Sequence, residues 1–146
     1  MWEDPDEIER LVEICMRRQE RLDGERPLQV CAIVWEAALR QLVGGLDTMR
    51  EQLERPLEAA KLPNVRLQVL PFHAGGHPCV PGAFTINSLA ETAAVDVVHA
   101  DTVASTVWVE SEAESAAYSA YFKRTARLSL ARHDAVLLID TIHQDM

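Results

Sequence analysis

Hydrophobic residues recur at helical spacing near the start of the chain. Over residues 5–22 one face of the predicted helix is apolar, and Pro5 suits its first turn. That face comprises Ile8, Leu11, Val12, Cys15 and Leu22. Residues 23–27 (DGERP) break the pattern. We therefore predict an amphipathic helix whose apolar side packs on a core.

A strand is predicted next, because residues 28–35 (LQVCAIVW) are almost continuously apolar and rich in β-branched side chains. Such a run is typical of a strand covered on both faces. Cys31 lies in this strand and Cys15 lies on the preceding apolar face, so both are expected to be reduced core residues. Residues 36–45 (EAALRQLVGG) follow and end at a pair of glycines.

The middle of the chain predicts one more helix and one more strand. The helix covers about residues 47–61, where Pro56 should kink it because its ring displaces a backbone carbonyl. Residues 64–71 (NVRLQVLP) then alternate between apolar and polar. This alternation predicts a half-buried strand with Arg66 and Gln68 on its polar side.

The C-terminal half contains three short strand patterns followed by two helical patterns. The strands are predicted at 83–89, 95–99 and 103–109. Ser111 and Glu114 have the spacing of a capping box, so one helix should run from there to about residue 127, and Ser129 should cap the last helix. The fold class is therefore α/β or α+β. We expect a single domain over residues 1–146, with one mixed sheet of about five strands packed by N-terminal, central and two C-terminal helices.

Charge narrows the choice of partner. The chain has 146 residues and a formal net charge of -9, and residues 67–122 contain no Lys or Arg but six acidic residues. Phosphate binding needs concentrated Lys and Arg, so we exclude a direct nucleic-acid partner and expect a small neutral or apolar metabolite. The charged N-terminus is unlike a signal peptide and no apolar run is long enough to span a membrane, so we expect a cytoplasmic protein without a membrane partner.

The stretch LPFHAGGHPCVPGAF at residues 70–84 places His73, His77 and Cys79 within seven positions. All three are zinc-ligand types, but the glycine pair and the prolines argue against a helix that would bring both histidines onto one face. No second ligand cluster accompanies them, so we assign no metal and no cofactor. Two interpretations stay open: a plain connection between strands, or a loop in which His73 is catalytic and His77 lines a ligand site.

Acid–base chemistry has three further candidates. His99 and Asp101 lie near the end of a short predicted strand, where an imidazole beside a carboxylate can form a general-base pair. The alternative is a turn in which Asp101 caps the backbone. Glu36 follows the first strand and is either an acid within a pocket or an exposed residue in the first turn of a helix.

Two tryptophans, Trp35 and Trp108, lie at or near strand ends. They either pack at the rim of the core or wall an apolar ligand pocket, whose lining typically combines aromatic side chains with a few polar groups. On the second hypothesis Phe72, His77 and Phe84 line the same pocket.

Several segments together resemble a known family. They are DPDEIERLVEICMRRQERL, EAALRQLVGGLDTMREQLERPLEAAKLPNVRLQVLPFHAGGHP, GAFTINSL and ESEAESAAYSAYFKRTARLSL, and the similarity covers roughly residues 4–131. The chain is similar to an actinobacterial domain of unknown function that normally follows an Xre-type helix-turn-helix in transcriptional regulators. The resemblance implies the sensory or partner-binding half of such a regulator, with no catalytic residues to carry over.

The chain also departs from the family pattern. No helix-turn-helix precedes the domain here, so we expect a truncated or stand-alone member. Trp35 stands where the family commonly has Asp, and residues 99–101 (HAD) replace an aromatic residue followed by an acidic turn. His77 matches a common family position, whereas His73 and Cys79 are particular to this chain.

Three functional hypotheses follow. The favoured one is a small-molecule-sensing or protein-interaction module of secondary metabolism, derived from an Xre-family regulator without its DNA-binding domain. The alternative is a stand-alone cyclase, isomerase or lyase that acts on a largely apolar metabolite through His and acid side chains. The third is a partner that dimerises with a full-length regulator and titrates it. A homo-oligomer is expected, because a shortened domain exposes surface that the missing segment would cover.

Overall fold

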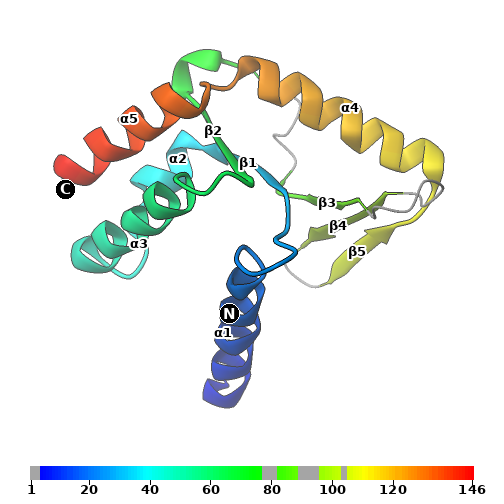
Figure 1. The fold of residues 1–146 in the computed structure, drawn as a ribbon, viewed down its shortest axis with the longest axis horizontal. Coiled ribbons are helices and arrows are strands. Elements are labelled where there is room, and N and C mark those ends of the chain that lie inside the picture. Colours follow the sequence, from blue (N-terminus) through cyan, green and yellow to red (C-terminus); the bar gives the residue numbers. More distant parts are fainter. Residues whose placement is uncertain (1–3, 77–81, 89–95, 103–104) are drawn as a thin grey trace. The chain divides into compact units, whose positions relative to one another are not determined.

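The computed structural model describes residues 4–76, 82–88, 96–102 and 105–146. Helices dominate both ends of this part of the chain, and short strands occupy its middle (Figure 1). The elements are α1 (Pro5–Glu20), β1 (Val30–Trp35), α2 (Glu36–Arg40), α3 (Leu46–Ala59), β2 (Val65–Leu70), the 3-10 helix η1 (Phe72–Ala74), β3 (Thr85–Asn87), β4 (Val97–Asp101), β5 (Thr106–Val109), α4 (Glu112–Leu128) and α5 (Arg132–Gln144). The fold is α+β, one of the two classes that the sequence pattern predicted.

The described strands form two sheets, so the prediction of one mixed sheet is wrong. β1 pairs with β2, and β3, β4 and β5 form a separate antiparallel sheet in that order. Hydrophobic alternation predicts where a strand lies, but not which strand its backbone will bond to. The last three strands are short and close in sequence, so each pairs with its neighbour along the chain.

The described chain divides into two compact units. The first comprises Met1–Ala32, Gln41–Leu67 and Arg132–Met146, and the second comprises Ile33–Arg40 and Gln68–Ala131. In the first unit α3 and α5 lie side by side (Figure 1). Leu53 of α3 is 1% exposed, and Ile139 and Ile142 of α5 are equally buried. The core of this unit therefore forms where these two helices meet.

In the second unit α4 packs on β3 and β4 (Figure 1). Val98 of β4 is completely buried, and the Ser115 hydroxyl of α4 donates a 2.7 Å hydrogen bond to the Asp96 carbonyl just before β4. Side chains alternate between the faces of a strand, so His99, next to Val98, lies on the face of the sheet opposite α4. One face of the three-stranded sheet is core, and the other points outward.

The N-terminal helix forms as predicted, but its apolar side is not buried. Pro5 occupies the first turn, and the Asp4 side chain caps the helix by accepting from the Asp6 amide at 3.0 Å. No residue of α1 is buried, and Cys15 is exposed. An amphipathic pattern establishes that a helix has an apolar face, but not what covers that face.

Burial also differs from expectation in both strands of the first sheet. The predicted strand over 28–35 begins at Val30 and has no buried residue, so Cys31 is an exposed thiol and not a core residue. Gln68, expected on the polar side of β2, is 3% exposed and donates to the Ala126 carbonyl at 3.1 Å. The prediction for Arg66 is confirmed, because its side chain is exposed.

Two predicted helix caps are absent from the structure. Ser111 precedes α4 but makes no side-chain capping hydrogen bond. Ser129 lies at the C-terminal end of α4, where its hydroxyl donates to the Thr125 carbonyl at 2.9 Å, and α5 begins only at Arg132. Both serines mark helix boundaries, although neither acts as the capping pattern predicted.

Replacing Leu53 with Ala should lower the free energy of unfolding by about 2–5 kcal/mol, because it leaves a cavity among buried side chains. Leu42→Ala is the matched control, since Leu42 is 55% exposed and the same truncation should change stability by less than about 0.5 kcal/mol. Chemical denaturation measures both. Equal losses in the two variants would contradict the placement of the core between α3 and α5.

Candidate functional site

The best-defined polar contact among the predicted site residues is made by Glu36. This residue begins α2 directly after β1, and it is only 7% exposed. One carboxylate oxygen accepts from Arg40 Nε at 2.8 Å, and the other accepts from the Phe72 backbone amide at 2.8 Å. The prediction of a first-turn helix residue is confirmed, but its expected exposure is wrong. The carboxylate can be buried because the Arg40 guanidinium and the Phe72 amide donate hydrogen bonds to it.

The electrostatics of this contact favour the charged form of Glu36. Burial raises the pKa of the carboxyl group. The hydrogen bond from the Phe72 amide, the hydrogen bond and charge of Arg40, and the charge of His73 together lower the pKa by more. The net pKa therefore lies below its ordinary value, and Glu36 is a fixed anion at neutral pH.

Four of the predicted site residues lie in the two segments that the hydrogen bond between Glu36 and the Phe72 amide joins. Trp35 precedes Glu36, while Phe72 and His73 belong to η1 on the other side of the hydrogen bond. Trp35 is 51% exposed, Phe72 is 54% exposed, and His73 is exposed as well. The segments joined by the buried carboxylate thus present aromatic and imidazole side chains to solvent.

A second group of predicted residues lies on the outward face of the three-stranded sheet. His99 of β4 is the register partner of Trp108 of β5, and their ring centroids are 5.2 Å apart with planes inclined at 39°. Asn87 of β3 places its amide nitrogen 3.2 Å from His99 Nδ1 and also donates to the Val97 carbonyl. An amide nitrogen can only donate, so Nδ1 of His99 is the acceptor in this contact.

His99 and Asp101 lie two residues apart on the same face of β4. The carboxylate of Asp101 accepts from the Thr106 hydroxyl at 2.6 Å, whereas the imidazole contacts Asn87 and Trp108. The contacts described therefore connect each of the two side chains to a neighbouring strand. A catalytic pairing of His99 with Asp101 stays a prediction.

The remaining predicted residues fall elsewhere. Phe84 packs its ring edge-on against Tyr118 of α4, with centroids 5.0 Å apart, and Tyr118 in turn meets Tyr121 at 6.5 Å. Phe84 is thus half-buried in an aromatic contact with the helix. His77, like Cys79, lies outside the described residues. Within the described ranges, no cluster of three or more His, Cys, Asp or Glu side chains is placed to hold a metal ion.

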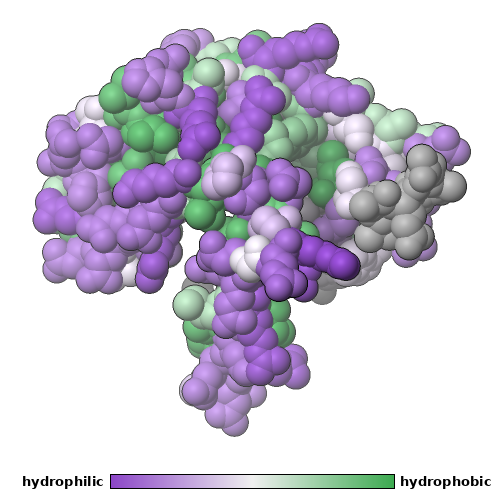
Figure 2. All heavy atoms as spheres, viewed as in Figure 1, coloured by the Kyte–Doolittle hydropathy of each residue, from purple (hydrophilic) through white to green (hydrophobic). Residues whose placement is uncertain are grey.

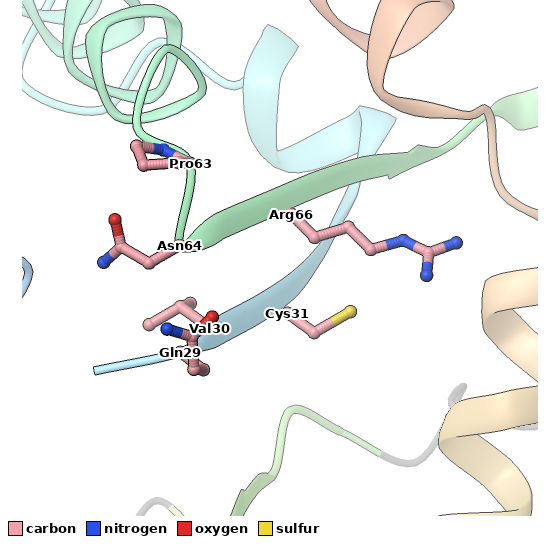
Figure 3. A pocket seen from close by; sticks show the side chains of 6 residues that line it. All are labelled: Gln29, Val30, Cys31, Pro63, Asn64 and Arg66. Atoms are coloured by element: carbon pink, nitrogen blue, oxygen red, sulfur yellow. The ribbon is translucent and has the colours of Figure 1, made fainter. Parts of the chain in front are cut away.

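A pocket of about 280 Å³ lies in the first unit, and none of its lining residues is a predicted site residue. Its lining comprises Gln29, Val30, Cys31, Pro63, Asn64 and Arg66. The Cys31 sulfur and the Arg66 guanidinium extend to the same side from neighbouring strands (Figure 3). Asn64 stabilises the wall, because its amide donates to the carbonyls of Leu22 and Leu28 at 3.0 and 2.8 Å.

Sequence reasoning missed three partners of the predicted residues. Arg40 could have been found, because Glu and Arg four positions apart pair on a helix surface. Asn87 and Thr106 could not, because their contacts with β4 depend on the strand register. The spacing of residues along one helix can be read from the sequence. Neighbours on adjacent strands are known only once the strand register is known.

The described residues define a small α+β domain with polar and aromatic side chains exposed at its surface. By sequence, residues 1–141 match a domain of unknown function, DUF5753, and the chain belongs to this family. Neither the curated proteins nor the solved structures gave a significant match. Among the described residues, no helix combines the length and apolar character needed to cross a membrane.

Replacing Glu36 with Gln should destabilise the protein by about 1–3 kcal/mol at pH 7, because a hydrogen-bonded charge is lost. The pKa of Glu36 in the folded state lies below the ordinary 4.5, so this stabilisation is complete above pH 4.5 and is lost as the pH falls through the folded-state pKa. The difference in unfolding free energy between the wild type and Glu36→Gln should therefore shrink in acid. Urea denaturation at a series of pH values measures it.

Glu58→Gln is the matched control for this measurement. Glu58 pairs with Arg55 at 3.3 Å on an exposed surface, and such pairs contribute less than about 1 kcal/mol. A Glu36→Gln difference that stayed constant from pH 7 to acid would contradict the charged state assigned to Glu36.

Proposed function

We propose that this chain is a binding module, the small-molecule-sensing or protein-interaction half of an Xre-type regulator. The outward face of the β3-β4-β5 sheet receives the partner. The observation that carries the proposal is the pair of His99 and Trp108, whose tilted rings lie 5.2 Å apart on the face of the sheet opposite α4. We call the surface formed by Asn87, His99 and Trp108 the aromatic face.

Exposure of the tryptophan supports a binding role. Trp108 is 61% exposed although it is among the largest apolar side chains, and exposed aromatic side chains are enriched where proteins bind partners. His99 supports its ring, and Asn87 orients His99, so the platform is held before any partner arrives. Preorganisation of this kind reduces the entropy lost on binding.

Charge indicates the chemistry of the partner. The described strands of this sheet carry Asp101 beside the aromatic face and no Lys or Arg, in line with the absence of basic residues over 67–122. An anion would therefore find no complementary charge on the sheet. A small neutral or apolar metabolite fits the surface best, with the corresponding patch of a regulator protein as the alternative partner.

The alternative function is a small cyclase, isomerase or lyase acting on a largely apolar metabolite. It would use His73, His99, Asp101 or Glu36 for proton transfer. Both oxygens of Glu36 and one oxygen of Asp101 already accept hydrogen bonds from the protein, which supports binding over acid–base chemistry at these positions.

The experiment that tests the proposal exposes the purified chain to the neutral fraction of a metabolite extract from its own organism. Bound compounds are followed over time by mass spectrometry. We expect one compound to be retained unchanged and in stoichiometric amount. Trp108→Ala should weaken its retention at least about tenfold, because truncating a central aromatic contact commonly costs 2 kcal/mol or more.

Val107→Ala is the matched control, since Val107 is 45% exposed on the same strand but points to the other face. Undiminished retention by Trp108→Ala would place the binding site elsewhere, and Trp35→Ala then tests the surface beside Glu36. Progressive conversion of a compound, abolished by His73→Ala or His99→Ala, would establish the enzyme instead. If no compound is retained or converted, co-purification with a full-length regulator tests the protein-partner hypothesis.

A further inference from the structure

The helix α1 carries an apolar stripe that nothing in the described structure buries. The stripe consists of Ile8, Leu11, Val12 and Cys15, with Leu22 just beyond the helix. Ile8 is 42% exposed and Val12 is 55% exposed. In Figure 2 the helix shows mainly hydrophilic residues to the viewer, with hydrophobic residues along its margins. The stripe is therefore exposed to solvent, as are the neighbouring apolar side chains of Ile14 and Met16.

A helix of this length gains from a partner. Its sixteen residues span about 24 Å, only just longer than the roughly 12–15 residues below which isolated helices are marginal in water even for favourable sequences. The Asp4 cap and the surface pair of Arg17 with Glu13 contribute only modestly. Covering the stripe would supply the burial that most protein helices depend on.

We propose that the stripe pairs with α1 of a second copy of this chain, and that the two helices run antiparallel. Charge complementarity between the two halves of α1 favours a second copy as the partner and an antiparallel arrangement of the two helices. The first half of α1 is mainly acidic and its second half is more basic. Asp4, Asp6, Glu7 and Glu9 with Arg10 precede Arg17, Arg18 and Arg21 with Glu13 and Glu20. An antiparallel copy brings the acidic half of each helix beside the basic half of the other, whereas a parallel copy aligns like charges.

The spacing of the stripe also specifies a register. Ile8, Cys15 and Leu22 recur every seven residues, which is the repeat of a two-helix seam. When Leu11 faces Cys15 of the other copy, Glu7 lies beside Arg21 of that copy, and the twofold axis repeats both contacts. The aliphatic stem of Arg18 then covers Ile8 while its guanidinium reaches solvent.

The dimer should be weak. Two helices of this length bury less than the roughly 1,200 Å² typical of stable interfaces, so association is expected at high protein concentration. Pairing through α1 does not depend on binding at the aromatic face, because α1 and that face belong to different units of the chain.

Sedimentation equilibrium on the full chain, from about 10 μM to 1 mM, tests the proposal. We expect the wild type to form dimers within this range. Glu7→Arg and Arg21→Glu should each weaken self-association at least about tenfold, since each replaces two attractive contacts with repulsive ones. An equimolar mixture of the two variants should recover the wild-type dimer fraction, and so should the double variant. Circular dichroism verifies that every variant is folded.

Arg10→Glu is the matched control, because it changes the charge of α1 by the same amount on the side opposite the stripe. The wild type remaining monomeric throughout would overturn the proposal. Single variants that associate as strongly as the wild type would also overturn it.

The relative direction of the two helices is tested by disulfide crosslinking under oxidising conditions, in a chain carrying Cys31→Ser and Cys79→Ser. Adding Leu11→Cys should yield disulfide-linked dimers through Cys15 of the other copy. Cys15 alone should yield few, because the antiparallel register separates the two Cys15 residues beyond bonding distance. Efficient crosslinking through Cys15 alone would show parallel helices and overturn the antiparallel arrangement.

Discussion

The second unit depends on one buried carboxylate. Glu36 accepts hydrogen bonds from Arg40 in its own helix and from the amide of Phe72, thirty-six residues later in the chain. Removing a carboxylate from water is costly, and the charge is tolerated here because both oxygens have strong donors. The bond keeps the start of α2 beside the start of η1. The exposed side chains of Trp35, Phe72 and His73 therefore occupy defined positions.

The three-stranded sheet illustrates how one pattern produces both core and surface. The period of two along β4 directs Val98 toward α4 and His99 away from it. Antiparallel register then places Trp108 opposite His99, which creates a platform that neither strand has alone. The exposed pair of His99 and Trp108 is in this sense a consequence of burying the other face.

The N-terminal helix also has an apolar side, but that side is not buried. Its stripe is as regular as that of α3, yet Leu53 of α3 is 1% exposed whereas Val12 of α1 is 55% exposed. The difference lies in the neighbours, since α5 packs against α3 and no described residue buries α1. Amphipathicity measures the capacity of a helix to pack, and only the tertiary structure shows whether that capacity is met within the chain.

The sequence by itself determined the order of the long helices and of the strands, a mixed helix-and-strand class, and the lack of basic charge over 67–122. Each of these follows from local spacing or composition. The tertiary structure decided how the strands divide into two sheets, that Glu36 and Gln68 are buried, and that Cys15 and Cys31 are exposed. It also decided which side chains meet, as Asn87 meets His99. These properties depend on contacts between residues distant in the chain, and local periodicity does not encode those contacts.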